Sequence, residues 1–270
     1  MTCIVDIGGS GIRVKQYRMV GNKLLQDIDE NTITIQFHKY IERVEGRNVF
    51  IKNNRKLISF VTPFKNCYVG ATGGVREAGV KNGVYKVYNN TTNKYLFDME
   101  VLSGVQEGKY ELMAAEYKFK NMEALLSMGS KSCQFNYNNK ITSVSVGFKN
   151  LSGKTNKFKI LQNKHIIGIS TLYWTAKDIE TNIKMKLADN MRGVKINAKF
   201  IEKLNKLDMS KYDDLLVDKI TLFKRIMNEI SGPDTIIVFK REWKNPQGKY
   251  IINWPTGRAL ETIYTLEDLK

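Results

Sequence analysis

The first third of the chain alternates apolar and polar residues, a pattern typical of strands with one buried face. The alternation predicts strands over residues 2–7, 11–19, 22–28 and 31–37. After a lysine-rich, turn-rich stretch, residues 61–69 predict a strand that leads into a glycine loop and a helix. Residues 82–93 are polar, and we expect them to form a surface loop.

Residues 95–102 predict another strand, after which the period of the pattern changes. Between 105 and 119, Tyr110, Met113, Ala114 and Tyr117 fall at three- and four-residue spacings, which predicts a helix. Further elements are predicted as paired strands within 125–137 and 140–148, a strand at 166–173, helices near 176–190 and 211–231, a strand at 235–241 and a closing helix from about 256.

The segment from residue 125 repeats the layout of the N-terminus, with a strand, a Gly/Ser corner and a second strand. Two such segments are typical of an actin-like architecture. We therefore expect an α/β protein with the two-lobed actin-like fold, a duplicated ribonuclease H-like unit with a central cleft between the lobes. The expected domains are an N-terminal lobe at 1–118, a C-terminal lobe at 119–255 and a closing helix at 256–270 that packs back toward the N-terminal lobe.

Composition changes this picture in one respect, the charge. The 270 residues include 43 Lys and Arg against 27 Asp and Glu, for a net charge of +16, which favours anionic partners such as nucleotides, polyphosphate or nucleic acid. The alternative is a lysine-rich solvated surface that reflects a biased composition. Charged residues within 1–20 exclude a signal-peptide core, and no apolar run reaches the roughly 18 residues that span a bilayer. We expect a cytoplasmic protein without membrane contact.

Cysteine and histidine are scarce. Cys3, Cys67 and Cys133 are odd in number, widely spaced and set among apolar residues, so we expect buried free thiols. His38 and His165 are isolated, and no Cys-x-x-Cys pair is present. A zinc site or a histidine general base is therefore not expected.

Candidate chemistry begins with the sequence Asp-Ile-Gly-Gly-Ser-Gly-Ile-Arg at residues 6–13, directly after an apolar run. Glycines let backbone N–H groups approach phosphate oxygens, and Asp6 at the end of a strand can hold a hydrated cation. Taken alone, the pattern also fits a tight β-turn beside an aspartate.

Four segments resemble, in the same order, motifs of the apyrase family (nucleoside triphosphate diphosphohydrolases). They are residues 6–13, residues 69–76 (Val-Gly-Ala-Thr-Gly-Gly-Val-Arg), residues 102–117 (with Ser-Gly-Val-Gln-Glu-Gly-Lys-Tyr) and residues 127–135 (Ser-Met-Gly-Ser-Lys-Ser-Cys-Gln-Phe). Weaker similarities follow at 168–174 and 254–260. The related exopolyphosphatase branch has similar loops. Arg-Glu-Ala at 76–78 is closer to that branch, and Glu-Gly-Lys-Tyr at 107–110 is closer to apyrases.

The resemblance implies metal-dependent hydrolysis of terminal phosphates of nucleoside di- and triphosphates by an in-line water. It implies that Glu107 is the catalytic base, with Thr72 and Ser127 also catalytic, and that Asp6 holds Mg²⁺ or Ca²⁺ through water. The implied phosphate-binding residues are Gly8, Gly9, Ser10, Arg13, Gly73, Arg76, Gly129, Ser130, Lys131, Ser132 and Gln134. Candidates for stacking on a nucleobase are Tyr173 and Trp174, with core packing as the alternative. A helix-start carboxylate, favoured by the helix dipole, is the alternative for Glu107.

The chain departs from the resemblance at Ser127, where the family carries Asp. Serine keeps a hydrogen bond but loses a charge, and loss of one catalytic electrostatic group costs on the order of 2–4 kcal/mol in the barrier. Ser130 adds a Cβ that can crowd a phosphate, and Lys131 adds positive charge. Two alternatives to a nucleotide hydrolase therefore stay open: a catalytically impaired protein that acts as a structural or anion/nucleic-acid-binding subunit, and an exopolyphosphatase.

Overall fold

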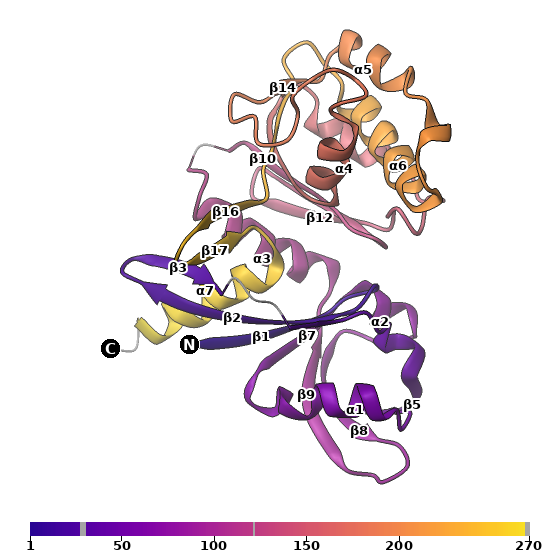
Figure 1. Cartoon of the computed structure of the whole chain (residues 1–270), viewed down its shortest axis with the longest axis vertical. Coiled ribbons are helices and arrows are strands. Elements are labelled where there is room, and N and C mark those ends of the chain that lie inside the picture. The colour runs from indigo at the N-terminus through magenta and orange to yellow at the C-terminus, as the bar shows by residue number, and fades with distance from the viewer. Residues whose placement is uncertain (28–30, 121, 268–270) are drawn as a thin grey trace. The chain divides into compact units, whose positions relative to one another are not determined.

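A computed structural model describes residues 1–27, 31–120 and 122–267 of the chain. Its contacts divide the chain into two compact units, Met1–Tyr110 with Trp243–Lys270, and Glu111–Glu242. Each unit contains one sheet with helices, so the mixed α/β class expected from the sequence is confirmed (Figure 1). The domain ranges expected from the sequence stay a prediction, because a division by contacts does not say which parts fold alone.

The first unit is built on a mixed sheet with strand order β16-β17-β3-β2-β1-β7-β9-β8-β6-β5, in which β4 also pairs with β2. The central strand β1 pairs antiparallel with β2 and parallel with β7, and α7 packs against β1 and β2 (Figure 1). Its elements are β1 (Thr2–Ile7), β2 (Ile12–Val20), β3 (Lys23–Gln26), β4 (Asn31–Ile33), β5 (Ile41–Glu45), β6 (Asn48–Ile51), α1 (Arg55–Val61), β7 (Tyr68–Ala71), α2 (Gly73–Glu77), β8 (Gly83–Asn89), β9 (Tyr95–Val101), the start of α3 (Gly104–Glu116), β16 (Glu242–Asn245), β17 (Gly248–Ile251) and α7 (Trp254–Glu267).

Two glycines let the closing helix α7 lie close to its neighbours. A Cβ on Gly70 of β7 would lie 2.4 Å from the ring of Trp254, which is buried. A Cβ on Gly257 would lie 1.8 Å from the carbonyl oxygen of Tyr110 in α3. The segment 254–260 therefore packs α7 closely against β7 and α3.

The cysteines contradict the expectation of three free thiols. Cys3 on β1 and Cys67, just before β7, form a disulfide across two paired parallel strands, 64 residues apart in sequence. Cys133 alone among the described cysteines is free, and burial raises the pKa of its thiol to about 12. The spacing of the cysteines in the sequence does not reveal this pair, because the contact depends on which strands are neighbours in the sheet.

The second unit is a sheet with strand order β12-β11-β10-β13-β15-β14, with α4, α5 and α6 packed together beside it (Figure 1). β10 pairs antiparallel with β11 and parallel with β13. No described helix is both long enough and apolar enough to cross a bilayer. The elements are β10 (Ala124–Met128), β11 (Cys133–Tyr137), β12 (Lys140–Val144), β13 (His165–Ser170), α4 (Thr171–Ile179), β14 (Val194–Lys195), α5 (Ala198–Asn205), α6 (Asp214–Ile230) and β15 (Ile236–Phe239).

Three local predictions were wrong. The stretch 82–93 is not a loop, because β8 buries Tyr85 and Val87 while Lys86 between them is exposed, the alternation of a half-buried strand. The stretch 61–69 is mostly helix and turn: α1 is capped by the side chain of Asn54, a 3₁₀ turn follows, and β7 starts only at Tyr68. The helix expected near 176–190 ends at residue 179.

Candidate functional site

The first hairpin places a carboxylate beside a glycine turn. Asp6 is the second-last residue of β1, and Arg13 faces it across the hairpin with Nη1 3.6 Å from Oδ2. Arg13 also donates from Nη2 to Ser10 Oγ at 3.3 Å. The turn closes through a backbone hydrogen bond from Gly8 N–H to the Gly11 carbonyl at 2.9 Å. Arg13 therefore braces both Asp6 and the turn, in addition to its expected role toward phosphate.

The glycine motif after β7 contacts this turn. A Cβ on Gly74 would lie 2.9 Å from Cα of Gly9, so the two backbones meet where neither has a side chain. Thr72 lies between β7 and α2 and is nearly buried, and its N–H donates to the Ile7 carbonyl at 3.1 Å. Its side chain makes no capping bond to α2. The structure thus brings Thr72 to the end of β1, and the roles expected of Thr72 and Gly73 stay predictions.

Helix α3 begins with a capping box that the sequence analysis missed. The Ser103 hydroxyl accepts from the Gln106 N–H at 3.1 Å, and the Gln106 side chain accepts from the Ser103 N–H at 2.9 Å. The spacing Ser-x-x-Gln at 103–106 is the signal that could have located it. This box fixes the first turn of α3 and so fixes the position of the next residue, Glu107.

Glu107 faces Arg76 and Asp6. Arg76 donates from Nη1 to the Leu102 carbonyl, and its Nη2 lies 3.6 Å from Glu107 Oε2. Burial raises the pKa of Glu107 to about 7; Arg76 works against this shift and the nearby Asp6 adds to it. In the described part of the chain, Oε2 of Glu107 is enclosed and has no hydrogen-bond partner. A carboxyl group with a pKa near neutrality can take a proton from a water molecule.

The residues fit a hydrated divalent cation better than a fully ligated one. No group of three or more His, Cys, Asp or Glu side chains among the described residues could hold a metal ion alone. Mg²⁺ keeps several waters and is commonly bound by one or two carboxylates together with substrate phosphates. Asp6 beside the glycine turn, with its side chain 13% exposed, suits contact through water.

The second hairpin gathers the remaining expected phosphate-binding residues within the second unit. Gly129 N–H donates to the Ser132 carbonyl at 3.0 Å, and a Cβ on Gly129 would lie 2.7 Å from that oxygen, so only glycine fits there. Gln134 donates to Ser132 Oγ at 2.8 Å. The carbonyl of Ser130 accepts from the Lys149 N–H at 2.8 Å, and Lys131 is half-buried. The hydrogen bonds from Gln134 and Lys149 therefore hold the turn from two sides.

Ser127 lies in a buried polar cluster that the sequence analysis did not find. Its Oγ is 2.9 Å from Oε1 of Glu111 and 3.2 Å from Oγ of Ser170. Glu111 is 4% exposed and comes from α3, and Ser170 ends β13. The only sequence signal for Glu111 was a carboxylate four residues after Glu107, on the same face of a predicted helix.

The two stacking candidates differ in exposure. Tyr173 is 3% exposed and donates its hydroxyl to Asp189 at 2.8 Å, so it packs in the core of the second unit. Trp174 is 37% exposed, with Arg241 and Lys177 against its ring at 5.1 and 5.4 Å. Of the two, Trp174 alone presents a ring to solvent, and nucleobase stacking by it stays a prediction.

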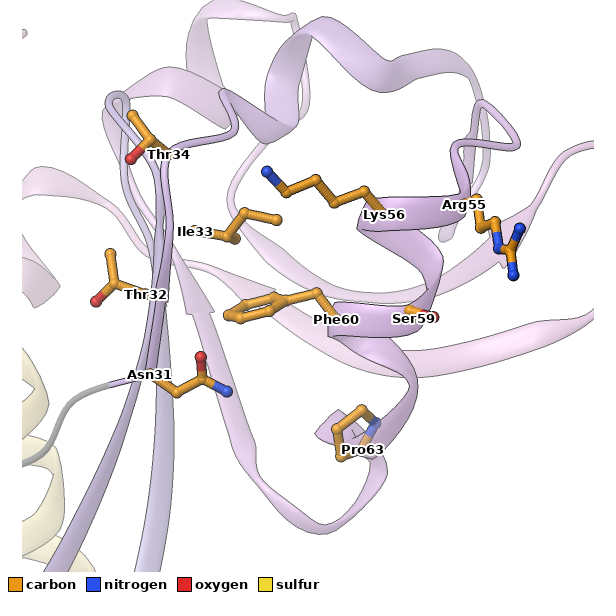
Figure 2. A pocket seen from close by; sticks show the side chains of 9 residues that line it. All are labelled: Asn31, Thr32, Ile33, Thr34, Arg55, Lys56, Ser59, Phe60 and Pro63. Atoms are coloured by element: carbon orange, nitrogen blue, oxygen red, sulfur yellow. The ribbon is translucent and has the colours of Figure 1, made fainter.

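A large pocket of about 910 Å³ lies elsewhere in the first unit, between α1 and the strand β4 (Figure 2). Figure 2 shows Lys56 and Phe60 reaching from α1 toward Ile33. The pocket is lined by Asn31, Thr32, Ile33, Thr34, Arg55, Lys56, Ser59, Phe60 and Pro63. The described residues that line this pocket include no carboxylate, whereas Glu107 offers one that could activate water.

Comparisons with solved structures support this fold. The chain is similar to a Ppx/GppA family member from Aquifex aeolicus, with a TM-score of 0.57 and 14% identity over 98% of this chain and 97% of that one. It is also similar to an exopolyphosphatase from Cytophaga hutchinsonii, with a TM-score of 0.55 and 13% identity over 99% of this chain and 97% of that one. It is similar as well to a nucleoside triphosphate hydrolase from Neospora caninum, with a TM-score of 0.52 and 9% identity over 98% of this chain and 92% of that one.

The chain has the actin-like fold. The similarity to these neighbours confirms the α/β fold class expected from the sequence. No protein-family model matches the chain. No curated protein sequence matches it either. The specific resemblance to apyrases therefore stays a prediction, because the neighbours include exopolyphosphatases as well as a nucleoside triphosphate hydrolase.

Proposed function

We propose that this protein hydrolyses the terminal phosphate of nucleoside di- and triphosphates in a metal-dependent reaction, with Glu107 activating the attacking water. The observation that carries the proposal is the position of Glu107, which is buried beside Arg76 and Asp6 and whose pKa is raised to about 7. A general base is most effective when its pKa is near the working pH. A carboxylate that served only the helix dipole would be solvated and would titrate in the ordinary acidic range.

The residues around Glu107 supply the other groups that the proposed reaction needs. The glycine turn after Asp6 offers backbone donors to phosphate oxygens, and Ser10 is held in that turn by Arg13. The Arg76 guanidinium lies beside the Glu107 carboxylate and lowers its pKa, against the effect of burial. A bound divalent cation supplies charge neutralisation on the phosphate oxygens. Asp6 would hold such a cation by accepting hydrogen bonds from its water ligands.

Phosphate release from a panel of nucleoside di- and triphosphates, with Mg²⁺ or Ca²⁺, tests the proposal. Glu107→Gln keeps the shape of the side chain and removes the base, and we expect kcat to fall on the order of 10²- to 10⁴-fold. Glu116→Gln is the matched control, because Glu116 is exposed on the same helix. Equal rates for wild type and Glu107→Gln would show that the assignment of the base is wrong.

Exopolyphosphatase activity is the second candidate, favoured by the neighbours from Aquifex and Cytophaga and by the net charge of +16. Long-chain polyphosphate belongs in the same assay. Activity on polyphosphate with none on nucleotides would select this candidate, and both activities should require Glu107.

A protein that binds anions without hydrolysing them is the remaining alternative, motivated by Ser127 and the basic composition. It predicts no phosphate release from any substrate, together with retention on nucleic acid that weakens steeply with salt.

A further inference from the structure

The segment that contains α5 of the second unit carries a local excess of positive charge. Eight of the 28 residues from 184 to 211 are Lys or Arg, against 43 of 270 in the whole chain. Three of the 28 are Asp or Glu, against 27 of 270, so the acidic share is that of the chain as a whole. A generally lysine-rich composition therefore does not account for the excess. The seven lysines, which we call the lysine surface, are Lys184, Lys186, Lys195, Lys199, Lys203, Lys206 and Lys211.

The folding of α5 turns its lysines away from the core. The side chain of Asn197 caps the helix by accepting from the Phe200 N–H at 3.1 Å. Phe200 is 1% exposed and packs in the core of the second unit, which fixes the rotation of the helix. Lys199, Lys203 and Lys206 follow at four- and three-residue spacings and so share one flank of α5.

Two grooves run along this flank and join. The first, of about 420 Å³, has no carboxylate among the described residues that line it, and its lysines are Lys186, Lys195, Lys199 and Lys203. The second, of about 290 Å³, is lined by one carboxylate, Asp208, and by the lysines Lys184, Lys203, Lys206 and Lys211. Because Lys203 lines both grooves, the lysine surface is continuous from the start of α5 to beyond its end.

Most of this charge is not neutralised by the protein itself. Three of the seven lysines make ion pairs at the surface, which are Lys186 with Glu180 at 3.1 Å, Lys206 with Glu202 at 2.6 Å and Lys211 with Asp208 at 3.7 Å. The other four make no ion pair within the described part of the chain, and they are Lys184, Lys195, Lys199 and Lys203. Like charges held together in this way attract a polyanion.

The other side chains of this surface indicate which polyanion fits. Protein interfaces are enriched in aromatic residues, Met and Arg, and single-stranded nucleic acids stack their bases on aromatic rings. Among the exposed residues from 193 to 211, none is aromatic, Met or Arg. A membrane-surface helix needs exposed large apolar side chains, and the same range presents none. What remains is contact with phosphates alone, as in the backbone of a duplex.

We propose that the lysine surface binds the phosphate backbone of double-stranded nucleic acid without reading its sequence. The charge is spread over two joined grooves, which suits a broad, stiff duplex, whereas a thin polyphosphate chain is better enclosed by a single channel. B-DNA carries one negative charge for about every 1.7 Å of its axis, so several lysines can contact phosphates at once. The inference does not depend on the proposed function, because none of the seven lysines has a role there.

Fluorescence anisotropy of a labelled DNA duplex of about 20 base pairs, titrated with the whole protein at different salt concentrations, tests the inference. Four phosphate contacts predict a slope of about −3.6 for log K against log salt, so that affinity falls about 150-fold between about 50 and 200 mM salt. Lys195→Gln/Lys199→Gln/Lys203→Gln should reduce the magnitude of this slope by about 2.7 and weaken binding at about 50 mM salt at least tenfold. The corresponding triple Lys→Arg variant keeps the charge and should bind within about threefold of wild type.

The matched control is Lys52→Gln/Lys56→Gln/Lys86→Gln, which removes the same charge from exposed lysines of the first unit and should leave the slope unchanged. Equal losses in the two triple Lys→Gln variants would show that net charge alone attracts the duplex, and would overturn the proposal. No binding by wild type at about 50 mM salt would overturn it too. If thermal melting shows that a triple variant does not fold, single Lys→Gln variants decide, each with an expected change in slope of about 0.9.

Unlabelled competitors, compared at equal concentration of negative charge, identify the partner. Duplex DNA should displace the labelled duplex more strongly than polyphosphate, single-stranded DNA or polyglutamate does, and a stronger effect of any of these three would overturn the assignment to a duplex. The outcome is separable from that of the proposed function. Wild type that binds duplex but releases no phosphate would keep this inference and end the proposed function, and wild type that releases phosphate but binds no duplex would do the reverse.

Discussion

We expect Glu107 to make the first unit less stable as the pH rises, and replacing Glu107 should reveal this. Its pKa is raised from 4.5 to about 7, mainly by burial, so the folded state holds the proton more tightly than the unfolded state does. The stability that this group contributes is therefore complete below about pH 4.5 and is lost as the pH rises through about 7. Glu107→Gln removes the titrating group and should remove this loss.

The size of the effect follows from the pKa values. A difference of about 2.5 in pKa, at about 1.36 kcal/mol for each unit, gives about 3.4 kcal/mol at full ionisation. About 1 kcal/mol of this is already lost at pH 5 and nearly all of it at pH 8.5. The advantage of Glu107→Gln over wild type should therefore grow by about 2.5 kcal/mol between pH 5 and pH 8.5.

Urea unfolding followed by tryptophan fluorescence measures this difference. Trp243 and Trp254 belong to the first unit and Trp174 to the second, so a Trp174→Phe background reports on the first unit. Each protein is unfolded at pH 5, 6, 7 and 8.5. The free energies of unfolding are compared where their dependence on urea concentration is the same for each protein. Glu116→Gln in the same background controls for the loss of one exposed carboxylate from α3.

Parallel stability curves for wild type and Glu107→Gln across this pH range would refute the reasoning. They would mean that Glu107 is solvated in the folded protein, and the base assignment would lose its physical ground. A growing advantage together with lost hydrolysis would instead show a site where stability is given up for activity.

Three further outcomes are expected. The kcat/KM of phosphate release should rise with pH to a plateau above about 7, because Glu107 must be ionised to accept a proton, and Arg76→Gln should move this limb to higher pH, since Arg76 lowers the Glu107 pKa. Reducing the Cys3–Cys67 disulfide, which spans 64 residues, should lower the unfolding free energy of the first unit by about 4 kcal/mol, and an unchanged urea midpoint with and without reductant would contradict this. Gly257→Ala should destabilise by about 1–3 kcal/mol in the same assay, although alanine ordinarily favours a helix, because its Cβ would meet a carbonyl of α3.

The fold was predictable from the sequence because its main features are local and periodic. The strand, glycine corner and second strand at residues 6–13 are contiguous, as is their repeat at 127–135, and the structure forms a four-residue hairpin turn at each. The helix expected between 105 and 119 is α3, within a few residues at each end. Patterns of this kind need no knowledge of which strands lie side by side.

The errors share a different cause, which is dependence on contacts between distant segments. Cys3 and Cys67 pair only because β1 and β7 are neighbours in the sheet, and their spacing in sequence carries no sign of it. Strand β8 was not predicted within the polar stretch 82–93, because every second residue of a strand with one solvated face is polar. The Asn and Gly residues of this stretch are also typical of turns.

Ser127 shows how this limit affects a functional conclusion. Judged along its own strand, Ser127 replaces a carboxylate and predicts a weakened or inactive protein. The structure places Glu111 against it from a helix that begins more than twenty residues earlier, so the loss at one position and the gain at the other belong to one hydrogen-bond unit.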